Sequence, residues 1–436
     1  MRLEETLIHT LKQFSGILVF LSFLSTILFY FIGNDYLIYS GLLAWAALVM
    51  LFPSLRNKKL LSLFLLLSVS GFVISTIYGF DIDFKKVFTA NQYLLTLLVG
   101  VGFLRLITSP KQEHVTQIPK GKNSFFKTYF GVHLFGSVIN MSSLILVGDK
   151  LHKRKPLSDS QIVLLTRAFA SDAYWSPFFV AFAVVSVYTP RLDNKIILLN
   201  GLVLALIAFL FTWFEVMRNK EFRIEEFEGY PISYESLILP FSLAILVLVT
   251  NHYYPSIKII ILIPAFALTL TLAVLSIKKS VLDFFVTMKH HILEDLPNMS
   301  SEISLFLVAG MFGIAMSSIV VGLHVTLPFT TFDWPQASLL LAALVIVSFL
   351  GVHPVISIAI ISSFLHDVNH TLFAAAFLMA WASTISTSPF SGVNLAIVPR
   401  YHLDGKRIFM LNIFYTLKMY VVHVLCLYVL SQYLDI

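Results

Sequence analysis

The sequence predicts an all-α polytopic membrane protein, built as an inverted-topology repeat with two re-entrant hairpins and two broken transmembrane helices. Three observations predict this class. Of the 436 residues, 58% are hydrophobic and only 12% are charged, with a mean hydropathy of +0.85, and soluble globular chains are far more polar. A Ser-Pro-Phe triplet interrupts an apolar stretch twice, at 176–178 and 388–390. Basic residues cluster in the short loops between apolar stretches, where they set membrane orientation.

The two triplets indicate an internal duplication. They are 212 residues apart (388 − 176), and the pairs Gly100/Gly310 and Gly136/Gly351 fall near the same separation. Proline removes a backbone donor and clashes with the preceding turn, so each copy carries a broken helix. Proline-interrupted spans in corresponding positions of two halves are typical of secondary transporters, whose binding sites lie at the breaks.

The N-terminal spans follow from hydropathy and charge. A bilayer core of about 30 Å needs about 20 apolar residues per helix, and about ten or eleven such segments lie between residues 15 and 433. We expect N-terminal transmembrane helices within 1–59, at 15–32 and 37–53. The first repeat covers 60–214, with spans at 60–79, 92–108 and 196–214. Basic clusters at 56–59 and 105–127 place these loops and the N-terminus in the cytoplasm.

The first hairpin is predicted at 125–147 because basic residues flank this apolar segment on both sides, at 120–127 and 150–155. A full crossing would put one cluster outside, whereas a hairpin returns both to the cytoplasm. Re-entrant backbone is tolerated only where it is buried in protein or lines an aqueous cavity. A broken helix at 162–188 follows.

The second repeat is predicted to repeat this order in the opposite orientation. A charged connector with linking helices covers 215–277, and the second repeat covers 278–436. It contains a hairpin at 337–366, a broken helix at 371–398 and a last helix at 408–432. We therefore expect a multi-pass protein of the cytoplasmic membrane with a cytoplasmic N-terminus and an extracellular C-terminus.

Candidate substrate-binding and ion-binding residues lie at the hairpin tips and at the breaks. A break frees carbonyls, which suit a cation, and exposes a half-helix N-terminus, which suits an anion. The alternative is that proline kinks a packed helix and the serines bond back to it. The predicted residues are Ser137, Asn140, Ser142, Asp172, Ser176, Pro177, His353, Pro354, Ser357, Thr387, Ser388, Pro389, Ser391, Gly392 and Asn394.

Two ionisable residues stand out among these candidates. An intramembrane carboxylate is costly, so Asp172 is a candidate to bind a coupling cation or a proton; the alternative is an ion pair with Arg167, five residues earlier. Its counterpart in the second half is Thr384 (384 − 172 = 212). His353, beside Pro354, is a candidate for proton coupling or anion contact. The alternative for His353 is a buried histidine with a satisfied hydrogen bond.

Other function classes find no support in the sequence. The net charge of +6 comes from loop residues, so no nucleic-acid partner is expected. No nucleotide-binding or protease signature is present, and we expect neither enzyme activity nor a bound metal or cofactor, apart from Na⁺ or H⁺ as a coupling ion. His366, Asp367 and His370 fit a solvated turn, and the cluster His290, His291, Glu294 and Asp295 fits a cytoplasmic linker.

The order of hairpin, broken helix and charged connector, repeated in inverted form, resembles the ion transporter superfamily, which includes divalent-anion/sodium symporters, citrate carriers and arsenite permeases. The resemblance covers roughly residues 60–430 and rests on the segments 175–178 and 388–395. Where the dicarboxylate symporters carry Ser-Asn-Thr at the hairpin tips, this chain has Asn-Met-Ser at 140–142 and His-Pro-Val at 353–355. The resemblance implies a substrate site between the hairpin tips and the breaks, and a homodimer.

The sequence thus predicts a secondary active transporter for a small organic or inorganic anion, carboxylate-like, with Na⁺ or H⁺ coupling and an elevator or rocking motion. Its partners are the anion and the lipid bilayer. An alternative is a membrane-embedded enzyme or a protein that handles a lipid-linked substrate, with Asp172 and His353 as acid and base. A passive channel is a third alternative, which two hairpins closing on one site disfavour.

Overall fold

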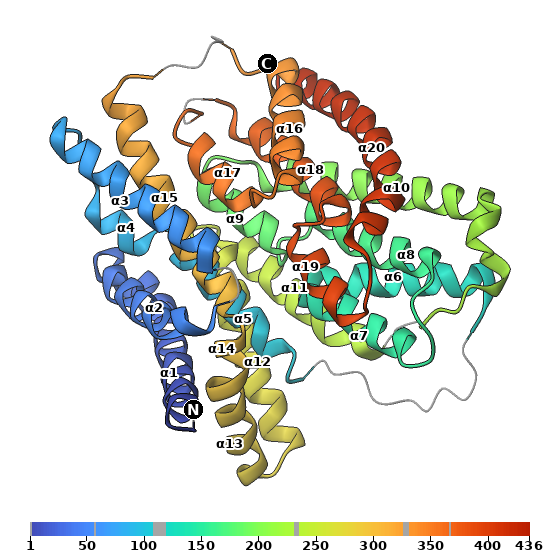
Figure 1. Cartoon of the computed structure of the whole chain (residues 1–436), viewed down its shortest axis with the longest axis horizontal. Helices are drawn as coiled ribbons and strands as arrows, with labels where there is room; N and C mark the ends of the chain where they lie inside the picture. The colour runs from blue at the N-terminus through green and yellow to red at the C-terminus, as the bar shows by residue number, and fades with distance from the viewer. Residues whose placement is uncertain (1, 56–57, 108–118, 231–234, 326–330, 366–367) are drawn as a thin grey trace. The chain divides into compact units, whose positions relative to one another are not determined.

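A computed structural model describes residues 2–55, 58–107, 119–230, 235–325, 331–365 and 368–436, and these residues are almost entirely helical (Figure 1). Nine helices in this described part are long and apolar enough to cross a membrane. The predicted all-α class of a polytopic membrane protein is confirmed at this level. The predicted loop positions 56–57 and 108–118, with the predicted turn residues His366 and Asp367, lie outside the described residues.

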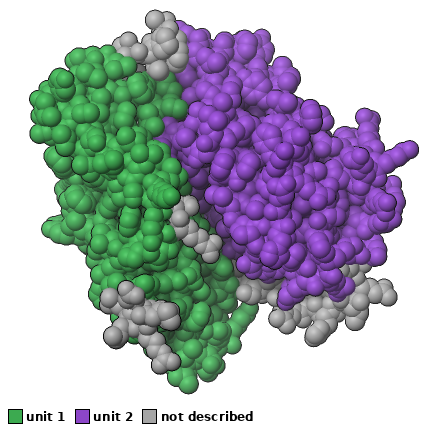
Figure 2. Space-filling model, viewed as in Figure 1, with its two compact units in different colours: residues 1–107, 243–328, 358–365 green, residues 108–242, 329–357, 366–436 purple. Residues whose placement is uncertain are grey.

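The chain divides into two compact units (Figure 2). Unit 1 comprises residues 1–107, 243–328 and 358–365, and unit 2 comprises residues 108–242, 329–357 and 366–436. Each unit takes segments from both predicted repeats, because the chain passes between the units several times. Two helices are shared between the units along their length, α11 (Glu235–Tyr253) and α17 (Pro354–Ile361).

Unit 1 is built from the N-terminal helices together with the helices of residues 259–322. Its elements are α1 (Arg2–Ile32), η1 (Asn34–Tyr36), α2 (Leu37–Leu51), η2 (Phe52–Ser54), α3 (Lys58–Ile77), α4 (Phe84–Thr89), α5 (Gln92–Leu104), α12 (Ile259–Lys278), α13 (Val281–His290), the π-helical turn η6 (His291–Asp295), α14 (Leu296–Asn298) and α15 (Ser300–Gly322).

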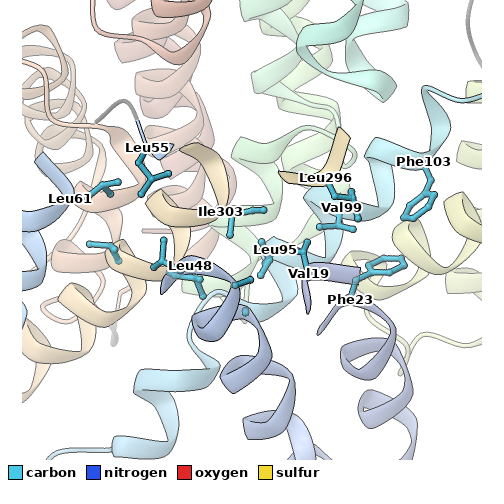
Figure 3. Close-up of a cluster of buried hydrophobic side chains, with 14 of the residues drawn as sticks. Val19, Phe23, Leu48, Leu55, Leu61, Leu95, Val99, Phe103, Leu296 and Ile303 are labelled. Atoms are coloured by element: carbon cyan, nitrogen blue, oxygen red, sulfur yellow. The ribbon is translucent and has the colours of Figure 1, made fainter. Parts of the chain in front are cut away.

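A single hydrophobic cluster holds unit 1 together (Figure 3). Phe23 of α1 and Phe103 of α5 stack with ring centroids 5.7 Å apart, and side chains from α2, α3, α12, α13, α14 and α15 join the cluster. Helices α5 and α12 pack very closely, since a Cβ on Gly100 would lie 2.4 Å from Cβ of Pro264 and 2.5 Å from its Cα. Glycine is therefore required at this crossing.

Replacing Gly100 tests this crossing. Gly100→Ala forces the backbones of α5 and α12 apart, because the obstacle includes a backbone atom, and such overpacking costs about 1–3 kcal/mol. Gly102→Ala on the same helix is the matched control, since its nearest neighbour, Sδ of Met299, is at an ordinary 3.6 Å. The midpoint temperature of thermal unfolding of the purified protein should fall for Gly100→Ala and should be unchanged or rise for Gly102→Ala. Equal midpoints for the two variants would contradict the close crossing.

Unit 2 contains the first predicted hairpin, both predicted broken helices and residues 337–357 of the second predicted hairpin, whose residues 358–365 belong to unit 1. Its elements are α6 (Gly121–Ile139), α7 (Met141–His152), α8 (Asp159–Ala170), η3 (Ser171–Tyr174), α9 (Val180–Tyr188), α10 (Asn194–Arg218), η4 (Lys220–Phe222), η5 (Ile224–Glu226), α16 (Trp334–Phe349), α18 (His370–Thr387), α19 (Gly392–Arg400) and α20 (Gly405–Tyr433).

The predicted broken helices form the centre of unit 2. All 18 residues of α18 are buried, and so are 11 of the 12 residues of α8. Helix α18 packs against α8, η3, α9, α10, α16 and α20. The outer helices α10 and α20 expose leucines and other apolar side chains. Polar atoms at the interruptions of α8 and α18 are therefore shielded by protein.

Candidate functional site

The first interruption lies between η3 and α9, at residues 175–179. Pro177 supplies no backbone N–H and disfavours helical geometry at the residue before it. The Ser176 hydroxyl donates to the carbonyl of Ser137 on α6 and accepts from the backbone N–H of Phe178 at 3.2 Å. One buried hydroxyl therefore fixes the turn and ties it to α6.

The second interruption, at residues 388–391 between α18 and α19, uses the same hydrogen bonds. The Ser388 hydroxyl donates to the carbonyl of Ser348 on α16 at 2.8 Å and accepts from the N–H of Phe390 at 3.2 Å. The serines are separated by 212 residues (388 − 176) and their carbonyl partners by 211 (348 − 137). The two Ser-Pro-Phe turns thus share their backbone anchoring as well as their sequence.

Positive-φ residues interrupt the two helix pairs that occupy the predicted hairpins. Asn140 joins α6 to α7 with φ 54°, and Gly351 lies between α16 and α17 with φ 99°. These positions are 211 residues apart (351 − 140). The amide nitrogen of Asn140 donates to the carbonyl of Phe178 at 3.2 Å, beside the first break. Its Oδ1 is buried and has no hydrogen-bond partner among the described residues.

Polar side chains after the second break satisfy the freed backbone. Ser391 donates to the carbonyl of Ile385 at 3.0 Å and caps α19 by accepting from the N–H of Asn394 at 3.1 Å. Asn394 donates to the carbonyl of Ser388 at 2.8 Å. Its Oδ1 is buried without a partner among the described residues. The back-bonding expected of a simple kink is therefore present, and it leaves one amide acceptor free.

A cavity of about 30 Å³ lies at the second break. This volume suits about two water molecules or one small ion. The His353 ring meets Trp381 edge to face at 5.5 Å, and its Nδ1 accepts from the N–H of Val355 at 3.2 Å. The lining residues are Ser348, Val352, His353, Pro354, Trp381, Thr384, Ile385, Ser388, Phe390, Ser391 and Gly392. Five predicted site residues thus meet at one cavity: His353, Pro354, Ser388, Ser391 and Gly392.

Asp172 lies one turn before the first break and is fully buried. Its Oδ1 is 2.8 Å from Nδ1 of His133 on α6. Its Oδ2 packs against the backbone of α6, where a Cβ on Gly136 would lie only 2.4 Å away. The carboxylate thus contacts a histidine of the first helix pair.

Arg167 does not pair with Asp172, because other groups engage it. The guanidinium donates to Glu215 Oε1 at 2.9 Å, to Asn412 Oδ1 at 2.8 Å and to the carbonyl of Leu411 at 2.9 Å. The ring of Tyr415 lies 4.1 Å from its Cζ. The alternative of an Asp172–Arg167 pair is therefore wrong in this structure.

The remaining predicted residues have ordinary helix contacts or lie apart. The Ser137 hydroxyl bonds back to the carbonyl of Leu134 at 2.9 Å, and Thr387 is 2.6 Å from the hydroxyl of Thr416 on α20. Ser142 lies half-buried in the first turn of α7. Ser357 is buried on α17, and its hydroxyl has no partner among the described residues. The ring of Pro177 is buried, and that of Pro389 is half-buried.

His370, predicted to lie in a solvated turn, is buried at the start of α18 and accepts from the backbone N–H of Arg191 at 3.1 Å, so that prediction is wrong for His370. In the predicted linker, His291 lies 3.0 Å from Asp295. No group of three or more His, Cys, Asp or Glu side chains that could hold a metal occurs among the described residues.

The end of the second broken helix binds the first helix pair. Arg400 at the end of α19 binds both carboxylate oxygens of Asp149 on α7, each at 2.7 Å. This hydrogen-bonded pairing holds the pKa of the Asp149 carboxyl below its ordinary value. Tyr401 adds a hydrogen bond to the carbonyl of Ile145 at 3.0 Å. The second broken helix is thus attached to the first helix pair.

Three residues that bind predicted site residues or their neighbours were not predicted from the sequence: His133, Asn412 and Glu215. His133 is a buried ionisable residue in an apolar helix, so the cost of burying a charge singles it out as it does Asp172. Asn412 and Glu215 lie on α20 and α10, far along the chain from the breaks. No spacing in the sequence links them to Arg167.

No protein-family model matches this chain, and no curated protein matches it either.

Removing the buried guanidinium should cost much more than removing a surface one. Arg167→Met leaves Oδ1 of Asn412 and Oε1 of Glu215 without the donor that Arg167 supplies, although Lys418 still binds Oε2 of Glu215. Breaking a buried pair costs about 3–5 kcal/mol. Arg407→Met is the matched control, because the Arg407 side chain is exposed where it pairs with Asp159, and surface ion pairs are worth about 1 kcal/mol or less. Thermal unfolding of the purified variants measures the loss of stability in each. Similar losses of stability for Arg167→Met and Arg407→Met would contradict the role of Arg167.

Proposed function

We propose that the chain is a secondary active transporter that moves a small organic or inorganic anion, carboxylate-like, across the cytoplasmic membrane, coupled to Na⁺ or H⁺. The observation that carries this proposal is the repeated break inside unit 2, where Ser176 and Ser388 anchor equivalent Ser-Pro-Phe turns. Two equivalent breaks in one compact body supply the paired half-helices around which secondary transporters build their sites.

We further propose that the pairs α6–α7 and α16–α17 are re-entrant hairpins of an inverted-topology repeat. The positive-φ interruptions at Asn140 and Gly351 support this. Each lies three residues after the serine whose carbonyl anchors a break, Ser137 in the first pair and Ser348 in the second. The flanking basic residues favour a cytoplasmic N-terminus and an extracellular C-terminus. The same elements support membership of the ion transporter superfamily.

An elevator motion is the form of alternating access that these units favour. Such a motion needs one compact body that carries the whole site, and unit 2 contains both breaks and the cavity. We propose that unit 2 transports and that unit 1 is the scaffold. A homodimer, common in the resembled superfamily, belongs to the same proposal.

The anion is proposed to bind at the N-terminus of α19. Ser388 and Ser391 line the cavity there, and the residues lining it include no Lys or Arg. The positive end of the half-helix then supplies the attraction for negative charge. Because 30 Å³ is too small for an organic acid, the cavity must widen when such an anion binds.

The alternative of an acid–base enzyme requires Asp172 and His353 to act together. Asp172 contacts His133 instead, and His353 contacts Trp381 and the Val355 N–H. No observation favours the enzyme over the transporter.

Ligand-dependent stability tests the anion site. An anion that binds the folded protein raises its unfolding free energy by about 2.7 kcal/mol at 100 times its dissociation constant. Purified protein should be stabilised by one class of a panel of organic acids and inorganic anions, and Ser388→Ala should reduce that shift because it removes a cavity hydroxyl.

The control for this experiment is Ser186→Ala, which removes a half-buried hydroxyl that bonds back to Phe182 on α9 away from the cavity. It should lower the unfolding temperature slightly and leave the anion-induced shift intact. If no anion stabilises the protein, or if both alanine variants lose the shift equally, the proposed anion site is wrong.

A further inference from the structure

The contact between Asp172 and His133 leaves the carboxylate poorly satisfied. Asp172 is fully buried, and its Oδ1 lies 2.8 Å from His133 Nδ1. The contact is not aligned as a hydrogen bond, and neither carboxylate oxygen has a hydrogen-bond partner among the described residues. Buried charges are normally paired and hydrogen-bonded, because an unpaired one is costly. This carboxylate therefore needs a compensating positive charge.

Trp175 determines where the imidazole of His133 carries its proton. The indole Nε1–H donates to His133 Nε2 at 3.2 Å, and an indole nitrogen can only donate. Nε2 is therefore unprotonated, and Nδ1 carries the hydrogen, facing the Ala168 carbonyl at 3.2 Å and the Ser171 hydroxyl at 2.9 Å. In this state His133 is neutral, so the pair has a net charge of −1 if Asp172 is ionised.

The ionisable groups on the surrounding elements do not supply the missing charge. Tyr129 on α6 stacks beside His133 at 6.5 Å and is uncharged. Arg167 on α8 pairs with Glu215 of α10, which also binds Lys418 of α20, so this guanidinium is directed away from Asp172. Of the other ionisable groups on elements that pack against α6 or η3, Lys122 pairs with Glu225, Glu226 with Arg223, Asp149 with Arg400, Asp159 with Arg407, and Tyr174 with His423. Lys127, Lys195 and Arg218 are exposed. Lys150 lies over the ring of Tyr230, His152 lies beside Tyr401, and His370 contacts Arg191.

Close packing favours a proton over a metal ion at this carboxylate. The position that a Cβ on Gly136 would occupy is 2.4 Å from Asp172 Oδ2, 2.9 Å from Ser143 Oγ and 3.2 Å from Phe169 Cδ2. A metal ion needs a shell of several oxygen ligands, whereas a proton needs none. A neighbouring imidazole also takes up a proton readily and would repel a cation once it had done so.

We propose that Asp172 and His133 together form a proton-binding site, and that its proton is the coupling ion of the transporter. The proposal rests on the proposed function, which left Na⁺ and H⁺ open. One proton from water binds the pair and makes it neutral, and the same proton leaves on the opposite side of the membrane. No other group is oxidised, reduced or transferred.

The proton also acts on the first break. A proton on His133 Nε2 faces the Trp175 indole N–H, and two donors cannot share that contact, so Trp175 must move. Trp175 directly precedes Ser176, whose hydroxyl anchors the break to Ser137. Proton occupancy therefore changes the geometry of the break.

Tryptophan fluorescence during a pH titration tests the site. The purified full-length chain is titrated from about pH 5 to about pH 9 in NaCl and in KCl of equal ionic strength. We expect a one-proton transition that is lost in Trp175→Phe and identical in the two salts. Asp172→Asn should weaken proton binding about tenfold or more, since it removes the opposite charge beside His133. Trp213→Phe is the matched control and should retain the transition.

Three results would overturn the proposal: no transition in the wild-type chain, a transition unchanged in Asp172→Asn, or a midpoint that NaCl but not KCl moves, which indicates a sodium site. If Asp172→Asn does not fold, infrared difference spectra of the wild-type chain replace it, and they must contain imidazolium or protonated-carboxyl bands.

The anion panel separates this proposal from the proposed function. If an anion stabilises the protein but no pH-dependent fluorescence transition occurs, the proposed proton site is wrong and the transporter proposal stands. If the transition occurs but no anion stabilises the protein, the proposed anion site is wrong and the proton site stands.

Discussion

The buried guanidinium of Arg167 is the interaction on which the organisation of unit 2 depends. It reaches Glu215 on α10 and Asn412 on α20 from the centre of α8. Asn412 in turn donates to the carbonyl of Ser386, in the last turn of α18. A charge without these partners would be too costly to bury. One polar network therefore holds the helix before each break, and it sets the position of both breaks.

The breaks combine structural and functional demands in the same side chains. Proline interrupts each helix, and a serine hydroxyl then anchors the resulting turn to a neighbouring helix. Much of the freed backbone is satisfied, so the kink interpretation and the binding-site interpretation describe the same residues. Among the described residues, the buried polar atoms near the breaks that have no hydrogen-bond partner include Oδ1 of Asn140, Oδ1 of Asn394 and both oxygens of the Asp172 carboxylate.

The sequence predicted the local features of this protein better than its long-range contacts. Hydropathy located the helices, and proline located both interruptions, because each effect is decided by neighbouring residues. The partner of Asp172 was not predictable in this way, since His133 lies 39 residues earlier (172 − 133) on another helix. The same holds for Arg167, whose nearest charged residue in the sequence is Asp172 but whose partners lie on α10 and α20. The interleaving of the compact units likewise reflects tertiary packing, which no periodicity records.

Transport by the purified chain in proteoliposomes tests the central claim most directly. The vesicles are loaded with one anion class and diluted into labelled anion, with and without an inward pH gradient and an inward Na⁺ gradient. The account predicts saturable uptake of one anion class that one of the two gradients accelerates. Uptake that rises linearly with concentration and ignores both gradients would indicate a passive channel and contradict the account, and so would the absence of uptake for every anion in protein that is folded.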